Sequence, residues 1–154
     1  MQITVNLNGK RVTGEIAPDT VLLDFVREQG CFSVKRGCET SNCGLCTVHM
    51  DGKPVLSCSV LAARADGKSV TTLEGLQKEA EEFGAFLADE GGEQCGFCSP
   101  GFIMNVLAMV NELKDPTEQE IQQYLAGNLC RCTGYQSQLR AIKKYLAMRQ
   151  EESR

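Results

Sequence analysis

Eight of the nine cysteines in this 154-residue chain fall into two groups of four, and this arrangement constrains the fold more than any other feature. The first group is Cys38, Cys43, Cys46 and Cys58, and the second group is Cys95, Cys98, Cys130 and Cys132. The first group opens with the C-x4-C-x2-C spacing of loops that bind a 2Fe-2S cluster through cysteine thiolates. The sequence therefore predicts two 2Fe-2S clusters, and an electron relay is the first hypothesis.

Composition and charge argue against several other classes of function. The formal net charge of -4 provides no basic surface for nucleic acid. No apolar run approaches the roughly 18 residues that suggest a membrane span, and the N-terminus lacks the pattern of a secretory signal. We therefore expect a cytoplasmic protein. Disulfides are rare in that compartment, so regularly spaced cysteines favour metal ligation over a disulfide scaffold.

The first 75 residues have the pattern of a small sheet around one helix. Residues 3–7 alternate apolar and polar side chains, Asn8-Gly9 is a strong hairpin signal, and residues 12–16 can form the returning strand. A helix is predicted after Pro18, with Asp19 or Thr20 as its N-cap and Gly30 at its end. Further strands are expected at 45–50, 54–57 and 69–73, and a short helix at 59–64.

The second half has a helical period. The sequence predicts helices over residues 74–89, from Ser99-Pro100 with Ser99 as N-cap, from the Thr117-x-x-Glu120 capping box to near Gly127, and over 135–148. Four helices indicate a compact bundle. We therefore expect an α+β chain with one domain over residues 1–75 and a second domain over residues 76–154.

The surroundings of the cysteines suit thiolate ligands. Four thiolates around an oxidised cluster leave a net negative charge, which backbone N–H groups can stabilise. Gly37 and Gly44 would let the backbone of the first loop approach the sulfur atoms. Cys98 lies just before a predicted helix N-terminus, which favours a nearby anion. The second group draws on two interhelical loops, which can meet at one end of the bundle.

Zinc is the main alternative, above all for the second group. Four-cysteine zinc sites usually pair two C-x2-C units, and neither group follows that pattern. The ninth cysteine, Cys31, is expected to be buried as a small apolar residue. The single histidine, His49, is expected to be an ordinary strand residue, because a Rieske-type site needs two histidines. No nucleophile triad or phosphate-binding loop is visible, so catalysis is expected on another chain.

Three segments of the chain carry a family resemblance. They are residues 37–48 and 94–101, which contain five of the cysteines, and residues 127–135, which contain Asn-Leu-Cys-Arg-Cys-Thr-Gly-Tyr. These motifs resemble the iron-sulfur subunit of the molybdenum hydroxylases, the xanthine dehydrogenase, aldehyde oxidoreductase, nicotinate dehydrogenase and carbon monoxide dehydrogenase family. The resemblance implies an N-terminal β-grasp plant-type ferredoxin-like 2Fe-2S domain, followed by an all-α four-helix 2Fe-2S domain.

The resemblance also implies roles for the two sites. The cluster on the second group would lie nearer the molybdenum cofactor, and the cluster on the first group nearer FAD. Gln94 would form a hydrogen bond to the pterin of the molybdenum cofactor. The chain would be a non-catalytic electron-transfer subunit that assembles with a large molybdenum-cofactor subunit and an FAD-binding subunit, with a dimer of heterotrimers as the expected assembly.

The resemblance implies hydroxylation of an aldehyde or of a carbon next to nitrogen, on another chain. A purine such as xanthine or hypoxanthine is the expected substrate, with nicotinate, aldehydes and carbon monoxide as alternatives. Two different roles remain open from the residues alone. The chain could be a free-standing ferredoxin between soluble partners, or a zinc-stapled interaction module without redox function.

Overall fold

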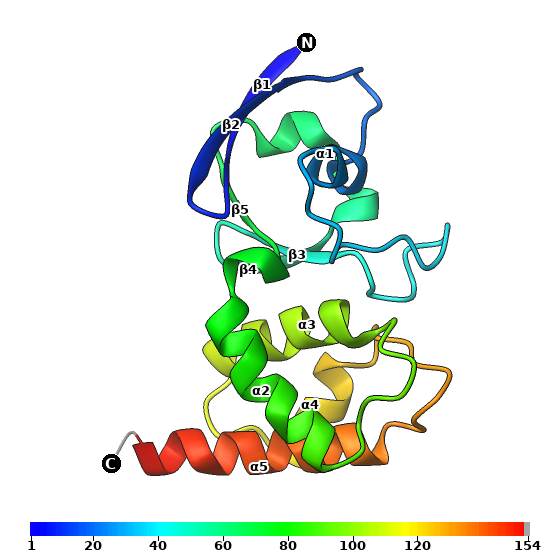
Figure 1. The fold of residues 1–154 in the computed structure, drawn as a ribbon, viewed down its shortest axis with the longest axis vertical. Helices are drawn as coiled ribbons and strands as arrows, with labels where there is room; N and C mark the ends of the chain where they lie inside the picture. Colours follow the sequence, from blue (N-terminus) through cyan, green and yellow to red (C-terminus); the bar gives the residue numbers. More distant parts are fainter. Residues whose placement is uncertain (153–154) are drawn as a thin grey trace.

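The computed structural model describes residues 1–152, which form a sheet half followed by a helical half (Figure 1). The strands are β1 (Gln2–Leu7), β2 (Lys10–Glu15), β3 (Thr47–Met50), β4 (Lys53–Leu56) and β5 (Ser69–Thr71). They form one sheet in the order β2-β1-β5-β3-β4, in which only the β1–β5 pair is parallel. The helix α1 (Leu22–Glu28) packs on this sheet. The predicted α+β fold class is therefore confirmed.

Two tight turns set the register of the sheet. Asn8 and Gly9 both have positive φ, at 52° and 80°, and join β1 to β2 with Leu7 opposite Lys10. Asp51 and Gly52 repeat this conformation between β3 and β4, at 50° and 80°. Two central residues with positive φ match the right-handed twist of the flanking strands. Both predicted turns are present.

The start of α1 differs from the prediction. Its N-cap is Val21, which has no capping side chain, so neither Asp19 nor Thr20 caps the helix. The Thr20 hydroxyl instead accepts a hydrogen bond from the Ala17 N–H, and the Leu22 N–H donates to the Val60 carbonyl at 2.7 Å. The predicted short helix at 59–64 is replaced by two 3-10 turns, η1 (Ser57–Ser59) and η2 (Ala62–Ala65).

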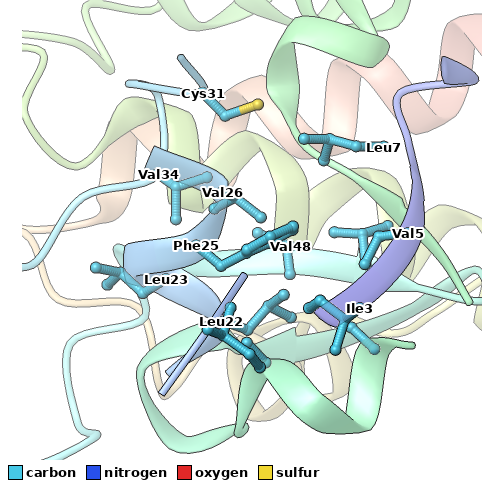
Figure 2. Packing of buried hydrophobic residues seen from close by; sticks show 14 of the residues in the cluster. Ile3, Val5, Leu7, Leu22, Leu23, Phe25, Val26, Cys31, Val34 and Val48 are labelled. Carbon is cyan, nitrogen blue, oxygen red and sulfur yellow. The ribbon is translucent and has the colours of Figure 1, made fainter. Parts of the chain in front are cut away.

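The apolar face of α1 and the inner face of the sheet form the first core. Figure 2 shows Phe25 and Val26 of α1 packed with strand residues such as Val5 and Val48. Cys31 lies in the same cluster and is 5% exposed, so the expectation of a buried, apolar cysteine is confirmed. Burial raises the pKa of the Cys31 thiol, which keeps it neutral at physiological pH.

The helical half contains the four predicted helices, α2 (Gln77–Asp89), α3 (Ser99–Glu112), α4 (Glu118–Tyr124) and α5 (Gln136–Glu152). The capping box at Thr117 and Glu120 is present, with both reciprocal hydrogen bonds formed. The N-cap of α3 is Cys98 and has no capping side chain, whereas Ser99 is the first helical residue. The prediction of Ser99 as N-cap is therefore wrong. No helix within residues 1–152 is long and apolar enough to cross a membrane.

The two halves meet where α3 packs against β3 and β4 (Figure 1). A Cβ atom at Gly101 in α3 would lie 2.5 Å from the Gly44 carbonyl oxygen and 2.8 Å from Leu45 Cα. His49 of β3 is buried, and its Nε2 donates to the Met104 carbonyl of α3 at 2.7 Å. The prediction of an ordinary strand residue missed this bond, because α3 lies 55 residues away in sequence.

The close approach at Gly101 yields a stability prediction. Gly101→Ala should lower the free energy of unfolding by about 1–3 kcal/mol, because the new methyl group meets backbone atoms that have little room to move. Gly84→Ala in α2 is the matched control, since its Cβ would meet nothing within 4 Å. That change should raise the stability by about 0.5–1 kcal/mol through helix propensity. Chemical denaturation measures both changes in the free energy of unfolding. Equal changes in the two variants would contradict the close packing of α3 against the sheet half at Gly101.

Candidate iron-sulfur sites

The first cysteine group lies on the loop between α1 and β3 and on the turn after β4. Cys38, Cys43 and Cys46 belong to the loop, and Cys58 belongs to η1. The thiols interact in two pairs, Cys38 with Cys43 and Cys46 with Cys58. The structure thus brings the four predicted residues of this group together.

The second cysteine group joins two interhelical loops at one end of the helical half. Cys95 and Cys98 precede α3, whereas Cys130 and Cys132 lie between α4 and α5. The sulfur atoms of Cys95 and Cys132 are 3.6 Å apart, and the Cys98 thiol interacts with Cys130. All nine cysteines are free thiols in the described chain. The pairing is again two by two, across loops that are more than 30 residues apart in sequence.

This two-by-two arrangement fits a two-iron core. Two sulfur atoms on one tetrahedral metal ion, each at about 2.3 Å, lie about 3.8 Å apart, close to the separation of Cys95 and Cys132. A 2Fe-2S core divides its four protein ligands between two irons, which matches two thiol pairs in each group.

Hydrogen-bond donors surround the first group. The backbone N–H groups of Thr40, Asn42 and Cys43 lower the pKa of the Cys38 thiol to about 6, so the thiolate is favoured there. The hydroxyls of Ser59 and Ser41 lie 3.5 Å and 3.8 Å from Cys58 Sγ. These donors favour the negative charge that four thiolates would share.

Gly37 brings the backbone close to the sulfur atoms, as the sequence predicted. A Cβ atom at Gly37 would lie 3.1 Å from Cys43 Sγ and 2.7 Å from Leu45 Cδ2. Any larger residue would therefore push the loop away from Cys43 or displace Leu45. Glycine at this position allows the loop to fold tightly around the first group.

The second group is stabilised by fewer donors. The Thr133 hydroxyl lies 3.2 Å from Cys130 Sγ and donates to it, and the backbone N–H groups of Cys132 and Thr133 reach the same sulfur. Burial raises the pKa of the Cys98 thiol to about 11, and the neighbouring thiols of Cys130 and Cys95 add to the effect. Because the ligand form is the thiolate, metal binding at Cys98 must release a proton.

A backbone hydrogen bond connects the two groups. The Leu129 N–H donates to the Cys43 carbonyl at 2.9 Å, and Leu129 directly precedes Cys130. Gly44 makes this approach possible, because its φ is +74° and a Cβ atom there would lie 2.6 Å from the Gly127 carbonyl oxygen. Both cysteine-bearing regions lie along the same side of the molecule (Figure 1). The sequence does not predict this connection, since nothing local in either loop indicates the other.

Gln94 lies beside the second group, next to Cys95. Its side chain is exposed, and Nε2 donates to the Cys132 carbonyl at 3.3 Å, so it ties the two interhelical loops together. Lys35 reaches the same region from the sheet half, where its Nζ donates to the Phe97 carbonyl at 3.2 Å and lies 4.6 Å from the centre of the Phe97 ring. The surface around the second group is therefore polar at Gln94 and apolar at the half-exposed Phe97.

Two family models and several relatives match the chain. The model for a 2Fe-2S iron-sulfur cluster binding domain matches residues 5–88, and the model for a 2Fe-2S binding domain matches residues 72–143. The nicotinate dehydrogenase small FeS subunit of Eubacterium barkeri is 42% identical over 86% of this chain and 87% of the relative. The xanthine dehydrogenase iron-sulfur-binding subunit of Escherichia coli O157:H7 is 46% identical over 87% of each chain. The chain belongs to the iron-sulfur small subunits of the molybdenum hydroxylases.

Solved structures of molybdenum hydroxylases also match the chain and agree with its assignment to this family. Quinoline 2-oxidoreductase from Pseudomonas putida 86 matches with a TM-score of 0.89 and 35% identity, over 99% of this chain and 96% of that chain. Aldehyde oxidoreductase from Desulfovibrio gigas matches with a TM-score of 0.89 and 34% identity, over 99% of this chain and 17% of that chain. The family resemblance and the presence of two 2Fe-2S binding domains are confirmed.

If the eight cysteines are the cluster ligands, substitution of one of them should lower the iron content of the protein. Cys43→Ser should reduce the iron content from about four atoms per chain to about two, because one of the two clusters loses a thiolate ligand. Cys31→Ala is the matched control, because Cys31 is buried in the first core, and it should keep the full iron content. Iron analysis and EPR of the reduced proteins measure both. Equal iron loss in the two variants would contradict the assignment.

Proposed function

We propose that this subunit relays electrons from a molybdenum cofactor to FAD, both held by partner subunits. The ligands of the relay are the two cysteine groups, Cys38, Cys43, Cys46 and Cys58, and Cys95, Cys98, Cys130 and Cys132. When bound, 2Fe-2S clusters supply one-electron redox chemistry at these positions. The observation that carries the proposal is the hydrogen bond from Leu129 to Cys43, which joins the two groups directly.

The chain itself provides a short connection between the groups. It runs from Cys43 Sγ along that residue to its carbonyl, across the 2.9 Å hydrogen bond to Leu129, and along the backbone to Cys130. Electrons tunnel more readily through covalent and hydrogen bonds than across an empty gap. The Cys43 end of this connection is buried, whereas Leu129 is about half exposed. The short bonded path favours rapid transfer between the two sites.

The family resemblance implies the direction of the relay, from the second group to the first, and the surfaces beside the two groups are compatible with it. We place the molybdenum cofactor next to the second group, where Gln94 is exposed. A glutamine amide has two N–H donors and one acceptor, so its single bond to Cys132 leaves hydrogen-bonding capacity for a pterin. We place FAD next to the exposed part of the first loop, at Thr40 and Ser41.

The names of the relatives support a nitrogen heterocycle as the substrate of the assembly. They include dehydrogenases of nicotinate, xanthine and caffeine, a nicotine 6-hydroxylase and a quinoline 2-oxidoreductase. We propose a purine such as xanthine or hypoxanthine, which would be hydroxylated on the molybdenum subunit. Nicotinate, an aldehyde or carbon monoxide are the alternatives. Substrate selection would reside on that other chain.

The proposed assembly is a cytoplasmic dimer of heterotrimers. Each heterotrimer would contain this chain, a large molybdenum-cofactor subunit and an FAD-binding subunit. Within this chain we place the domain boundary between residues 75 and 76, at the end of the 3-10 turn η3 (Leu73–Gly75). Exposed apolar side chains near the second group, Phe97 and Leu129, would be covered by the molybdenum subunit.

Purification of the tagged chain from its native host tests this proposal. We expect two larger subunits to copurify, one with a molybdenum cofactor and one with FAD, and the complex to be reduced by one member of a panel of purines, nicotinate and aldehydes. A chain that purifies alone and carries electrons between soluble partners would instead be a ferredoxin. A colourless, EPR-silent chain that contains zinc would be an interaction module, and either result contradicts the proposal.

Gln94→Ala tests the proposed contact with the molybdenum cofactor. In the complex, substrate should reduce the clusters roughly threefold to tenfold more slowly, the effect of one lost hydrogen bond, while both EPR signals remain. Gln123→Ala is the matched control, because Gln123 is an exposed glutamine of α4. Stopped-flow absorbance measures the rates. An unchanged rate and an unchanged affinity between the subunits would contradict the role of Gln94.

A further inference from the structure

A glutamine side chain is buried beside the second cysteine group. Gln138, the third residue of α5, is 3% exposed. Its Nε2 lies 3.9 Å from Cys98 Sγ, whereas its Oε1 is buried and has no hydrogen-bond partner among the described residues. A buried amide that loses its hydrogen bonds to water costs free energy. The presence of an amide here therefore needs an explanation.

The surroundings of Gln138 would accept an apolar side chain. Gln138 lines a cavity whose other walls include Phe102, Leu139 and Ile142, all of which belong to the second core. A leucine or methionine of similar size would leave no polar atom unpaired in this place. The amide therefore serves a purpose other than packing, and the one polar group it reaches is the sulfur of Cys98.

Cys98 has fewer hydrogen-bond donors than Cys38 or Cys130. Cys38 accepts from three backbone N–H groups, and Cys130 accepts from the Thr133 hydroxyl and two backbone N–H groups. Cys98 has one backbone N–H, its own. Apart from the thiol of Cys130, Gln138 is the side chain that reaches Cys98 Sγ within residues 1–152.

The orientation of the amide follows from electrostatics. A thiolate ligand is negative, so it attracts an N–H group and repels a carbonyl oxygen. With Nε2 toward Cys98, the amide donates to the sulfur, and Oε1 is the atom left without a partner among the described residues. The reverse orientation would place the oxygen against the negative sulfur as well as leaving the NH2 group unpaired.

We propose that Gln138 donates an N–H···S hydrogen bond to Cys98 and thereby raises the reduction potential of the second cluster. This inference rests on the proposed function, because it requires a cluster on Cys95, Cys98, Cys130 and Cys132. Reduction adds negative charge to a cluster and its thiolates, so a donor to sulfur stabilises the reduced form more than the oxidised form. Gln138 would thus help to set how readily electrons enter the relay.

The test replaces the amide by apolar side chains of similar size. In Gln138→Leu and Gln138→Met, the reduction equilibrium constant of one cluster should fall roughly threefold to tenfold, which is about 30 to 60 mV for a one-electron couple. The potential of the other cluster should not change. Gln136→Leu is the matched control, since Gln136 is an exposed glutamine two residues earlier in the same helix, and it should shift neither potential. EPR-monitored redox titration of the full-length protein measures both potentials.

Each possible result either supports or overturns the proposed role of Gln138. Lower potentials of the same cluster in both Gln138 variants support it, and shifts no larger than in Gln136→Leu overturn it. Loss of that cluster in both variants, with the other cluster retained, would show a purely structural role and would also overturn it. Wild-type protein without two clusters would refute the proposed function itself. The two failures are therefore distinguishable.

Discussion

The proposed relay depends on one contact, the hydrogen bond from the Leu129 N–H to the Cys43 carbonyl. It is one of the points at which a loop of the sheet half meets a loop of the helical half, and each loop carries thiols. If the halves were separated by a few ångströms, each cysteine group would remain intact but their connection would be lost. In the proposed relay, the packing of the two halves therefore matters for electron transfer as well as for stability.

Small residues and buried polar groups hold the halves at this separation. Gly44 and Gly101 allow backbone to lie against backbone, where a single added carbon would come within 2.6 Å of a carbonyl oxygen. His49 adds a buried hydrogen bond from β3 to Met104 of α3, and Lys35 bonds the carbonyl of Phe97. These contacts restrict how α3 can move against the sheet, because packed interiors tolerate little change in shape.

Features that depend on nearby residues were predictable from the sequence, and features that depend on distant residues were not. The two hairpin turns, the capping box at Thr117 and the burial of Cys31 follow from local pattern and composition. The predicted N-caps were wrong: at α1 the Leu22 N–H bonds the distant Val60 carbonyl, and α3 begins one residue earlier than its Ser-Pro signal indicates. The buried contacts of His49 and Gln138 could not be predicted from the sequence either, since each partner lies 40 residues or more away along the chain.

EPR spectroscopy of the fully reduced, full-length protein tests the central claim most directly. Two 2Fe-2S clusters whose ligand loops are joined by one hydrogen bond should each give a signal on reduction, and the signals should show magnetic interaction when both clusters are reduced together. Partial reduction should remove that interaction. Two signals that never interact would contradict the direct connection through Cys43 and Leu129, and a zinc-containing protein without an EPR signal would contradict the relay.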